Sequence, residues 1–143
     1  MTQRRQVLAG AAAALLCRPS LATPDSMRAA LAVFSGGAPL RDGRVQLEIP
    51  ALVENGNAVP VRLSVAGAAP GQVRRLALFS EANPQPDVAV FEFGPLSGSA
   101  RVATRMRLAT SQAVVAVAQM ADGSCWQQRV DVLVTLAACV EGG

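Results

Sequence analysis

The chain has 143 residues, and all 13 of its basic residues are arginine, since it contains no histidine and no lysine. Without these side chains it cannot form a Ser-His or Cys-His dyad, a Schiff base or a histidine-ligated metal site. Its few cysteines cannot supply a four-cysteine zinc centre either. We therefore predict a protein with no catalytic machinery and no cofactor, whose chemistry relies on thiols, carboxylates or arginines.

Residues 1–22 have the pattern of an export signal. Arg4 and Arg5 precede an uncharged run at 7–16, and small residues at the end of the segment indicate cleavage after Ala22. The run is too short to span a bilayer, which takes roughly 20 residues. The paired arginines are typical of a twin-arginine signal, which exports folded proteins. An ordinary secretory signal with two adjacent arginines is the alternative, and either route predicts a periplasmic protein.

Removal of this signal changes the charge of the protein. The remaining 121 residues contain ten arginines and ten carboxylates, so the mature formal charge is zero. A nucleic-acid-binding protein would need a basic excess, and we exclude that class. The mature length suits one domain with a core of its own.

The first predicted element of the mature chain is a short amphipathic helix at 25–35. Met27, Leu31 and Phe34 recur at helical spacing, and Pro24 precedes them. The glycine pair at 36–37 ends the pattern.

From Arg44 onwards the hydrophobic period changes to two, which is typical of half-buried strands. Clusters of glycine, proline and asparagine separate the runs, because these residues favour turns. About seven short strands predict an all-β, immunoglobulin-like antiparallel sandwich. The predicted strands lie at 44–49, 59–65, 73–79, 88–93, 99–108, 112–120 and 124–136.

The run at 113–118 is apolar at every position, so both of its faces should be covered. It therefore predicts a central strand. The second cover is either the helix at 25–35 or a partner protein.

The last predicted strand leads into a tail of small residues that carries Cys139. The tail at 137–143 also contains Ala137, Ala138, Gly142 and Gly143. Three extended residues beyond Leu136 would hold the cysteine roughly 10 Å from the domain. A thiol on such a tail is an attachment point that other proteins can reach, because its thiolate is nucleophilic.

The other mature cysteine, Cys125, lies beside Trp126. We predict that it is a small buried apolar residue. A Cys125–Cys139 disulfide is the alternative, since an oxidising compartment would permit it.

Four segments of the mature chain carry a family resemblance: 52–61 (LVENGNAVPV), 78–86 (LFSEANPQP) with 91–93 (FEF), 104–109 (TRMRLA) and 115–124 (VAVAQMADGS). In this colinear order they resemble the SoxY family of sulfur-carrier proteins. The resemblance implies an immunoglobulin-like sandwich, a heterodimer with a SoxZ-like subunit, and transient contacts with other Sox enzymes. It also implies that Cys139 carries thiosulfate-derived sulfur.

Together with the signal pattern, the resemblance predicts three parts: a signal at 1–22, an immunoglobulin-like carrier domain at 23–136 and a C-terminal swinging arm at 137–143. The family's arm has glycine pairs on both sides of its cysteine. Here Ala137 and Ala138 precede Cys139, and the glycine pair is displaced to the end of the chain. Alanine restricts a backbone that glycine leaves free. A divergent binding or assembly module that no longer carries sulfur is therefore the alternative function.

Overall fold

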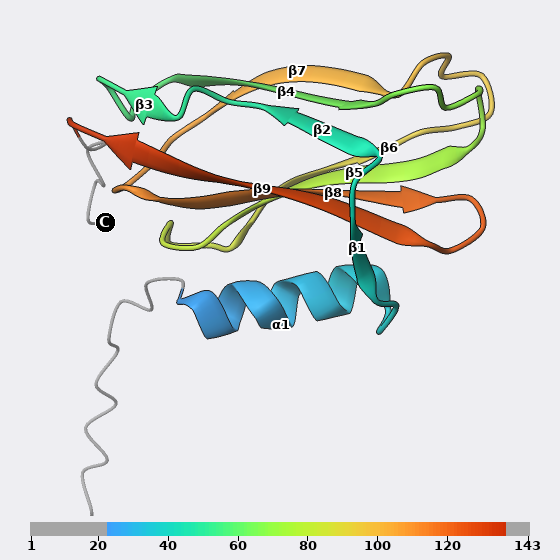
Figure 1. Cartoon of the computed structure of the whole chain (residues 1–143), viewed down its shortest axis with the longest axis horizontal. Helices are drawn as coiled ribbons and strands as arrows, with labels where there is room; N and C mark the ends of the chain where they lie inside the picture. The colour runs from blue at the N-terminus through green and yellow to red at the C-terminus, as the bar shows by residue number, and fades with distance from the viewer. Residues whose placement is uncertain (1–22, 137–143) are drawn as a thin grey trace, which may run out of the picture.

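The computed structural model describes residues 23–136, which form two packed β-sheets with one helix outside them (Figure 1). The helix lies against the outer face of the larger sheet, and the smaller sheet forms the opposite layer. The elements are α1 (Pro24–Ser35), β1 (Leu40–Asp42), β2 (Val45–Glu48), β3 (Leu52–Val53), β4 (Val59–Val65), β5 (Val73–Ser80), β6 (Asp87–Glu92), β7 (Arg101–Met106), β8 (Gln112–Met120) and β9 (Cys125–Val134).

Helix α1 matches its sequence prediction, and its ends have clear causes. Thr23 is the N-cap, and its side chain and that of Ser26 each accept a hydrogen bond from the other residue's backbone N–H. Pro24 takes the first turn, where its missing N–H costs no hydrogen bond. Gly36 ends the helix with φ of 62°, in the left-handed region that glycine adopts without strain.

The larger sheet has the strand order β1-β9-β8-β5-β6, and the smaller sheet has the order β2-β4-β7. The seven long strands agree with the sequence prediction to within a few residues. Two further strands, β1 and β3, pair with β9 in parallel. They have three and two residues, which is too short to produce a recognisable hydrophobic period.

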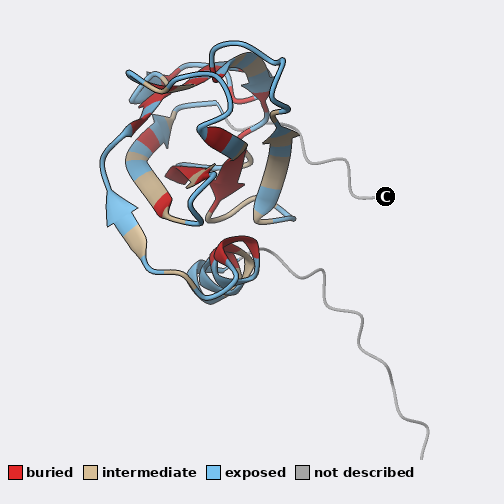
Figure 2. Cartoon of the chain, turned by 90° about the vertical axis from the view of Figure 1, so that its right-hand side faces the viewer, coloured by how far each residue is buried: buried red, intermediate tan, exposed pale blue. Residues whose placement is uncertain are grey.

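Strand β8 is buried on both faces, as the sequence predicted. Val114 and Ala116 face the core between the sheets, whereas Val115 and Val117 face a second core under α1. Figure 2 shows the buried side of the helix turned towards the sheet. The helix is therefore the cover for the outer face of β8.

Within the part of the chain that the structure describes, no helix is long and apolar enough to cross a membrane.

Candidate functional site

The residues that the sequence singled out for function lie outside the described part of the chain. Cys139 and its neighbours belong to 137–143, and the export-signal residues Arg4, Arg5 and Ala22 belong to 1–22. The structure does describe the root of the arm, which is the segment from Val134 to Leu136 where the chain leaves β9.

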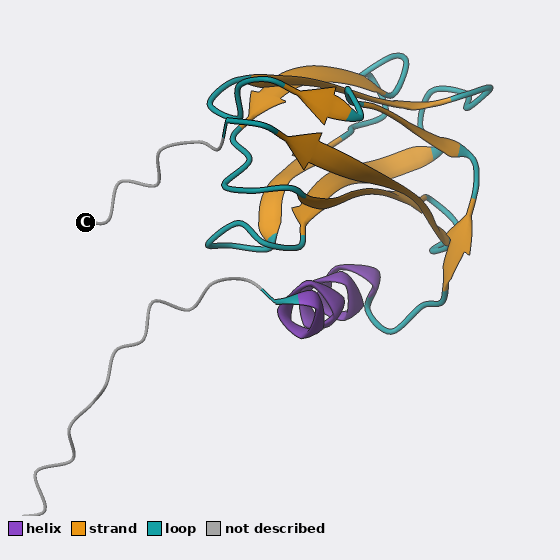
Figure 3. Cartoon of the chain, turned by 60° about the vertical axis from the view of Figure 1, so that its left-hand side comes forward, coloured by secondary structure: helices purple, strands orange, loops and turns teal. Residues whose placement is uncertain are grey.

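The arm root is held by hydrogen bonds from two directions. The Thr135 N–H donates to the Val53 carbonyl at 3.0 Å, and its hydroxyl lies 3.3 Å from the Glu54 carbonyl. On the other side, the Val134 N–H donates to the Ser111 hydroxyl at 2.8 Å. The described chain is therefore fixed to the sandwich up to its last residues, among the loops that gather at this end (Figure 3).

Gly56 makes the final link to the arm root. Its N–H donates to the Leu136 carbonyl at 2.8 Å, and its carbonyl accepts from the Leu108 N–H at 2.8 Å. Asn55 shapes this loop, because its side-chain oxygen accepts from the Asn57 N–H at 2.9 Å, as in an Asx turn. The sequence predicted a turn region between the strands at 44–49 and 59–65 but gave no sign that it would hold the C-terminal end of β9.

Three exposed leucines lie at or beside the arm root. Leu52 of β3 and Leu133 of β9 are register partners, and each is 58% exposed. Leu136, at the root itself, is 62% exposed. This end of the domain therefore offers an apolar surface beside the start of the arm.

Cys125 lies at the opposite end of β9 from the arm root. Its side chain is completely buried in the core under α1, beside Phe79 and Val117, and its thiol is free. Burial raises the pKa of the Cys125 thiol, because the thiolate loses its hydration, and nearby Arg75 offsets this only in part. The prediction that Cys125 is a buried apolar residue is confirmed.

A disulfide between Cys125 and Cys139 within one chain is out of reach. Strand β9 holds Cys125 and Val134 about 29 Å apart, since each of the nine steps rises roughly 3.2 Å. The five steps from Val134 to Cys139 span about 18 Å at full extension. The remaining gap exceeds the roughly 7 Å between Cα atoms that a disulfide tolerates.

We expect one reactive thiol in the folded mature protein and two after unfolding. Cys125 is shielded from solvent, and its raised pKa keeps the thiolate population low near neutral pH, so it should react only when the domain opens. Titration with an aromatic disulfide reagent at pH 7–8, with and without urea, counts the reactive thiols in the unfolded and the folded protein. Two rapidly reacting thiols in the native protein would contradict the buried position of Cys125.

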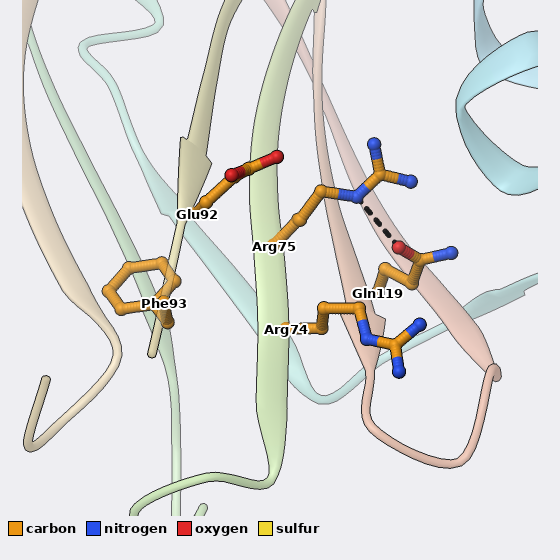
Figure 4. A pocket seen from close by; sticks show the side chains of 5 residues that line it. All are labelled: Arg74, Arg75, Glu92, Phe93 and Gln119. Atoms are coloured by element: carbon orange, nitrogen blue, oxygen red, sulfur yellow. Dashed lines mark hydrogen bonds between the residues drawn. The ribbon is translucent and has the colours of Figure 1, made fainter. Parts of the chain in front are cut away.

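A surface pocket near the C-terminal end of α1 contains side chains that stabilise the position of the helix. Arg74, Arg75, Glu92, Phe93 and Gln119 line it (Figure 4). The Arg75 Nε donates to the Gln119 Oε1 at 2.7 Å, and its Nη2 donates to the Phe34 carbonyl at 3.1 Å. The same guanidinium lies 4.3 Å from the centre of the Phe34 ring. Arg75 therefore fixes the C-terminal end of the helix to the sheet.

Among residues 23–136, no group of three or more acidic or cysteine side chains could hold a metal ion. The described domain instead combines a two-sheet sandwich, a buried thiol at Cys125 and hydrogen bonds that hold the chain at residues 134–136. Fold and site together define an immunoglobulin-like domain whose last strand is held at its C-terminal end.

The comparisons with known proteins agree with this class. The sequence model of the sulfur oxidation protein SoxY matches residues 30–139, which is more than half of the chain. The chain belongs to the SoxY family, whose members are carriers in the Sox sulfur-oxidation system rather than enzymes. Among curated proteins, none matches the chain.

Solved structures support the same fold. The sulfur carrier protein SoxY from Chlorobium limicola f thiosulfatophilum has a TM-score of 0.66 and 29% identity, with 78% of this chain and 98% of that chain covered. A superoxide reductase (neelaredoxin) from Ignicoccus hospitalis has a TM-score of 0.55 and 22% identity, covering 64% and 80%. The superoxide reductase from Nanoarchaeum equitans has a TM-score of 0.54 and 12% identity, covering 66% and 100%. The two reductases are similar in fold alone.

Proposed function

We propose that this protein carries thiosulfate-derived sulfur covalently on Cys139 and presents it to partner enzymes. The observation that carries the proposal is the fixed arm root, from which Cys139 is only three residues away. The family match also extends to residue 139. Because Cys125 is buried under the helix, Cys139 is the cysteine left to act as the attachment point.

The proposed loading step has a simple electron balance. The Cys139 thiolate and the terminal sulfur of thiosulfate form one S–S bond and release two electrons. A partner enzyme of the redox class accepts these electrons. The carrier contributes the nucleophilic sulfur and the reach of its arm, and later enzymes act on the sulfur held there.

Intact-mass analysis tests this function directly. After incubation of the mature protein with thiosulfate and the partner enzymes, we expect a mass increase that a reducing agent reverses, since the cargo is held by an S–S bond. The altered tail sequence favours the alternative of a binding module that carries no sulfur. An unchanged mass under these conditions would support that alternative.

We also propose a heterodimer with a SoxZ-like subunit. Helix α1 covers the outer face of β8. The apolar character of this strand therefore gives no support for a partner protein. The exposed leucines beside the arm root, Leu52, Leu133 and Leu136, give the proposal a different apolar surface. Purification of the protein from its native host should yield a complex of two different subunits. A soluble monomer in gel filtration, with no second band, would argue against this partnership.

We propose, in addition, that the protein is exported into the periplasm by the twin-arginine route. Arg4 and Arg5 supply the signal, and cleavage after Ala22 would keep Thr23, the N-cap of α1, in the mature protein. A route for folded proteins would let the partner subunit leave the cytoplasm together with this chain. Cell fractionation of an R4K/R5K variant tests the route, because loss of the arginine pair should retain the protein in the cytoplasm.

A further inference from the structure

The outer face of the smaller sheet has a charge unlike that of the rest of the domain. Side chains alternate along its strands, and the outward positions carry arginine, small or polar residues. We call the set Glu48, Arg62, Arg101, Arg105 and Arg107 the basic face; all five are exposed. Its formal charge is +3. The other described residues contain six arginines and eight carboxylates, which gives −2.

The arginines of the basic face have no acidic partners in the described structure. The ion pairs found within residues 23–136 involve Arg28 and Arg129 alone. Arg62 has Glu48 as its register partner on β2, but the two side chains form no ion pair. Arg101 and Arg105 lie opposite Ser64 and Pro60 of β4. Like charges gathered on one sheet face repel one another, so an external acidic surface would relieve this repulsion.

The basic face contains no large exposed hydrophobic residue. The exposed ones are Val33 of α1, Val90 of β6, Leu96 in the loop before β7, and the leucines near the arm root, Leu52, Leu133 and Leu136. Permanent subunit interfaces are markedly apolar, whereas complementary charge speeds the encounter of transient partners. The composition of this face therefore fits a partner that binds and leaves better than it fits a permanent subunit.

One end of the basic face adjoins the root of the arm. Arg105 and Arg107 flank the C-terminal end of β7, and Leu108 follows directly. The Leu108 N–H donates to the Gly56 carbonyl, and the Gly56 N–H donates to the Leu136 carbonyl, both at 2.8 Å. Two hydrogen bonds thus connect this end of the face to the start of the arm, at the end of the sandwich where β9 also finishes (Figure 1).

From these observations we infer that the basic face docks an acidic surface of the enzymes that act on the arm. The inference rests on the carrier function proposed above and adds the surface through which the enzymes approach. Binding at the face would bring the arm root to the enzyme's surface, and the arm would then reach inward. Because the attraction is electrostatic, transfer should be fast at low ionic strength and slow as salt screens the charges.

The test compares two double variants that remove the same amount of charge. R105Q/R107Q removes the two positive charges at the end of the basic face that adjoins the arm root. R28Q/R74Q neutralises two exposed arginines elsewhere, on α1 and β5. Each is made in the full mature chain, purified with its partner subunit and checked for an unchanged melting temperature. The readout is the second-order rate constant of Cys139 loading by the thiosulfate-coupling enzyme, measured by intact mass from 10 to 300 mM NaCl.

We expect R105Q/R107Q to lower the rate constant about ten-fold at low salt and to flatten its salt dependence, within the range known for electrostatic steering. The control should stay within about two-fold of the parent protein. Equal rates, or equal losses in both variants, would overturn the inference while leaving the carrier function intact. Loss of the partner subunit from R105Q/R107Q would also overturn it, because the face would then be the permanent interface. A parent protein that never loads would refute the proposed function itself.

Discussion

Replacement of Cys139 by serine is expected to abolish sulfur loading completely and to leave the stability of the domain unchanged. Serine lacks the nucleophilic sulfur that forms the S–S bond with the cargo, so no stable adduct can form. In the sequence the arm follows the residues that are hydrogen-bonded at Leu136, and both cores that the structure describes are built from residues within 23–136. Intact mass after incubation with thiosulfate and the partner enzymes measures loading, and urea denaturation measures stability.

The matched control is C125S, which changes the same atom in the buried cysteine. It should load normally but lose about 1–3 kcal/mol of unfolding free energy, since a hydroxyl would replace a thiol in the core under α1. The two variants should therefore have opposite phenotypes. If C139S still gains thiosulfate-derived mass, the assignment of the carrier residue is wrong.

Truncation of Phe34 to alanine should have the largest effect on stability among single changes in the helix. The ring is 7% exposed and meets Phe79 edge to face, with ring centres 5.7 Å apart. The guanidinium of Arg75 also lies close to this ring. Loss of the ring leaves a cavity between helix and sheet, and we expect a loss of about 3 kcal/mol in the free energy of unfolding. The midpoint of urea denaturation measures it.

The neighbouring residue Val33 supplies the control for this change. It is 83% exposed on the same helix, so V33A should alter the unfolding free energy by less than about 0.5 kcal/mol. F34A should also leave loading at Cys139 intact, because the helix and the arm act independently in the proposed mechanism. A loss as small as that of V33A would mean that α1 contributes little to the second core.

The sequence alone determined the local elements of this protein. The helix could be predicted because its first-turn proline, its apolar spacing and its terminating glycines all lie close together in the chain, between Pro24 and Gly37. The seven long strands could be predicted because alternation and turn residues are also local signals. The buried state of Cys125 was predicted from its residue type and its position beside Trp126. The absence of histidine and lysine also limited the chemistry to thiols, carboxylates and arginines.

Only the tertiary structure decided how distant segments meet. The pairing of β1 and β3 with β9, the cover that α1 provides for β8, and the link from Gly56 to Leu136 join residues far apart in the chain. The basic face likewise gathers side chains from β2, β4, β7 and the residue that follows β7. Hydrophobic period and turn chemistry act over a few residues, whereas strand order depends on how whole sheets bury their faces against each other. Hydrophobic period and turn residues can therefore be identified directly in one sequence. Strand order becomes visible only in the folded structure.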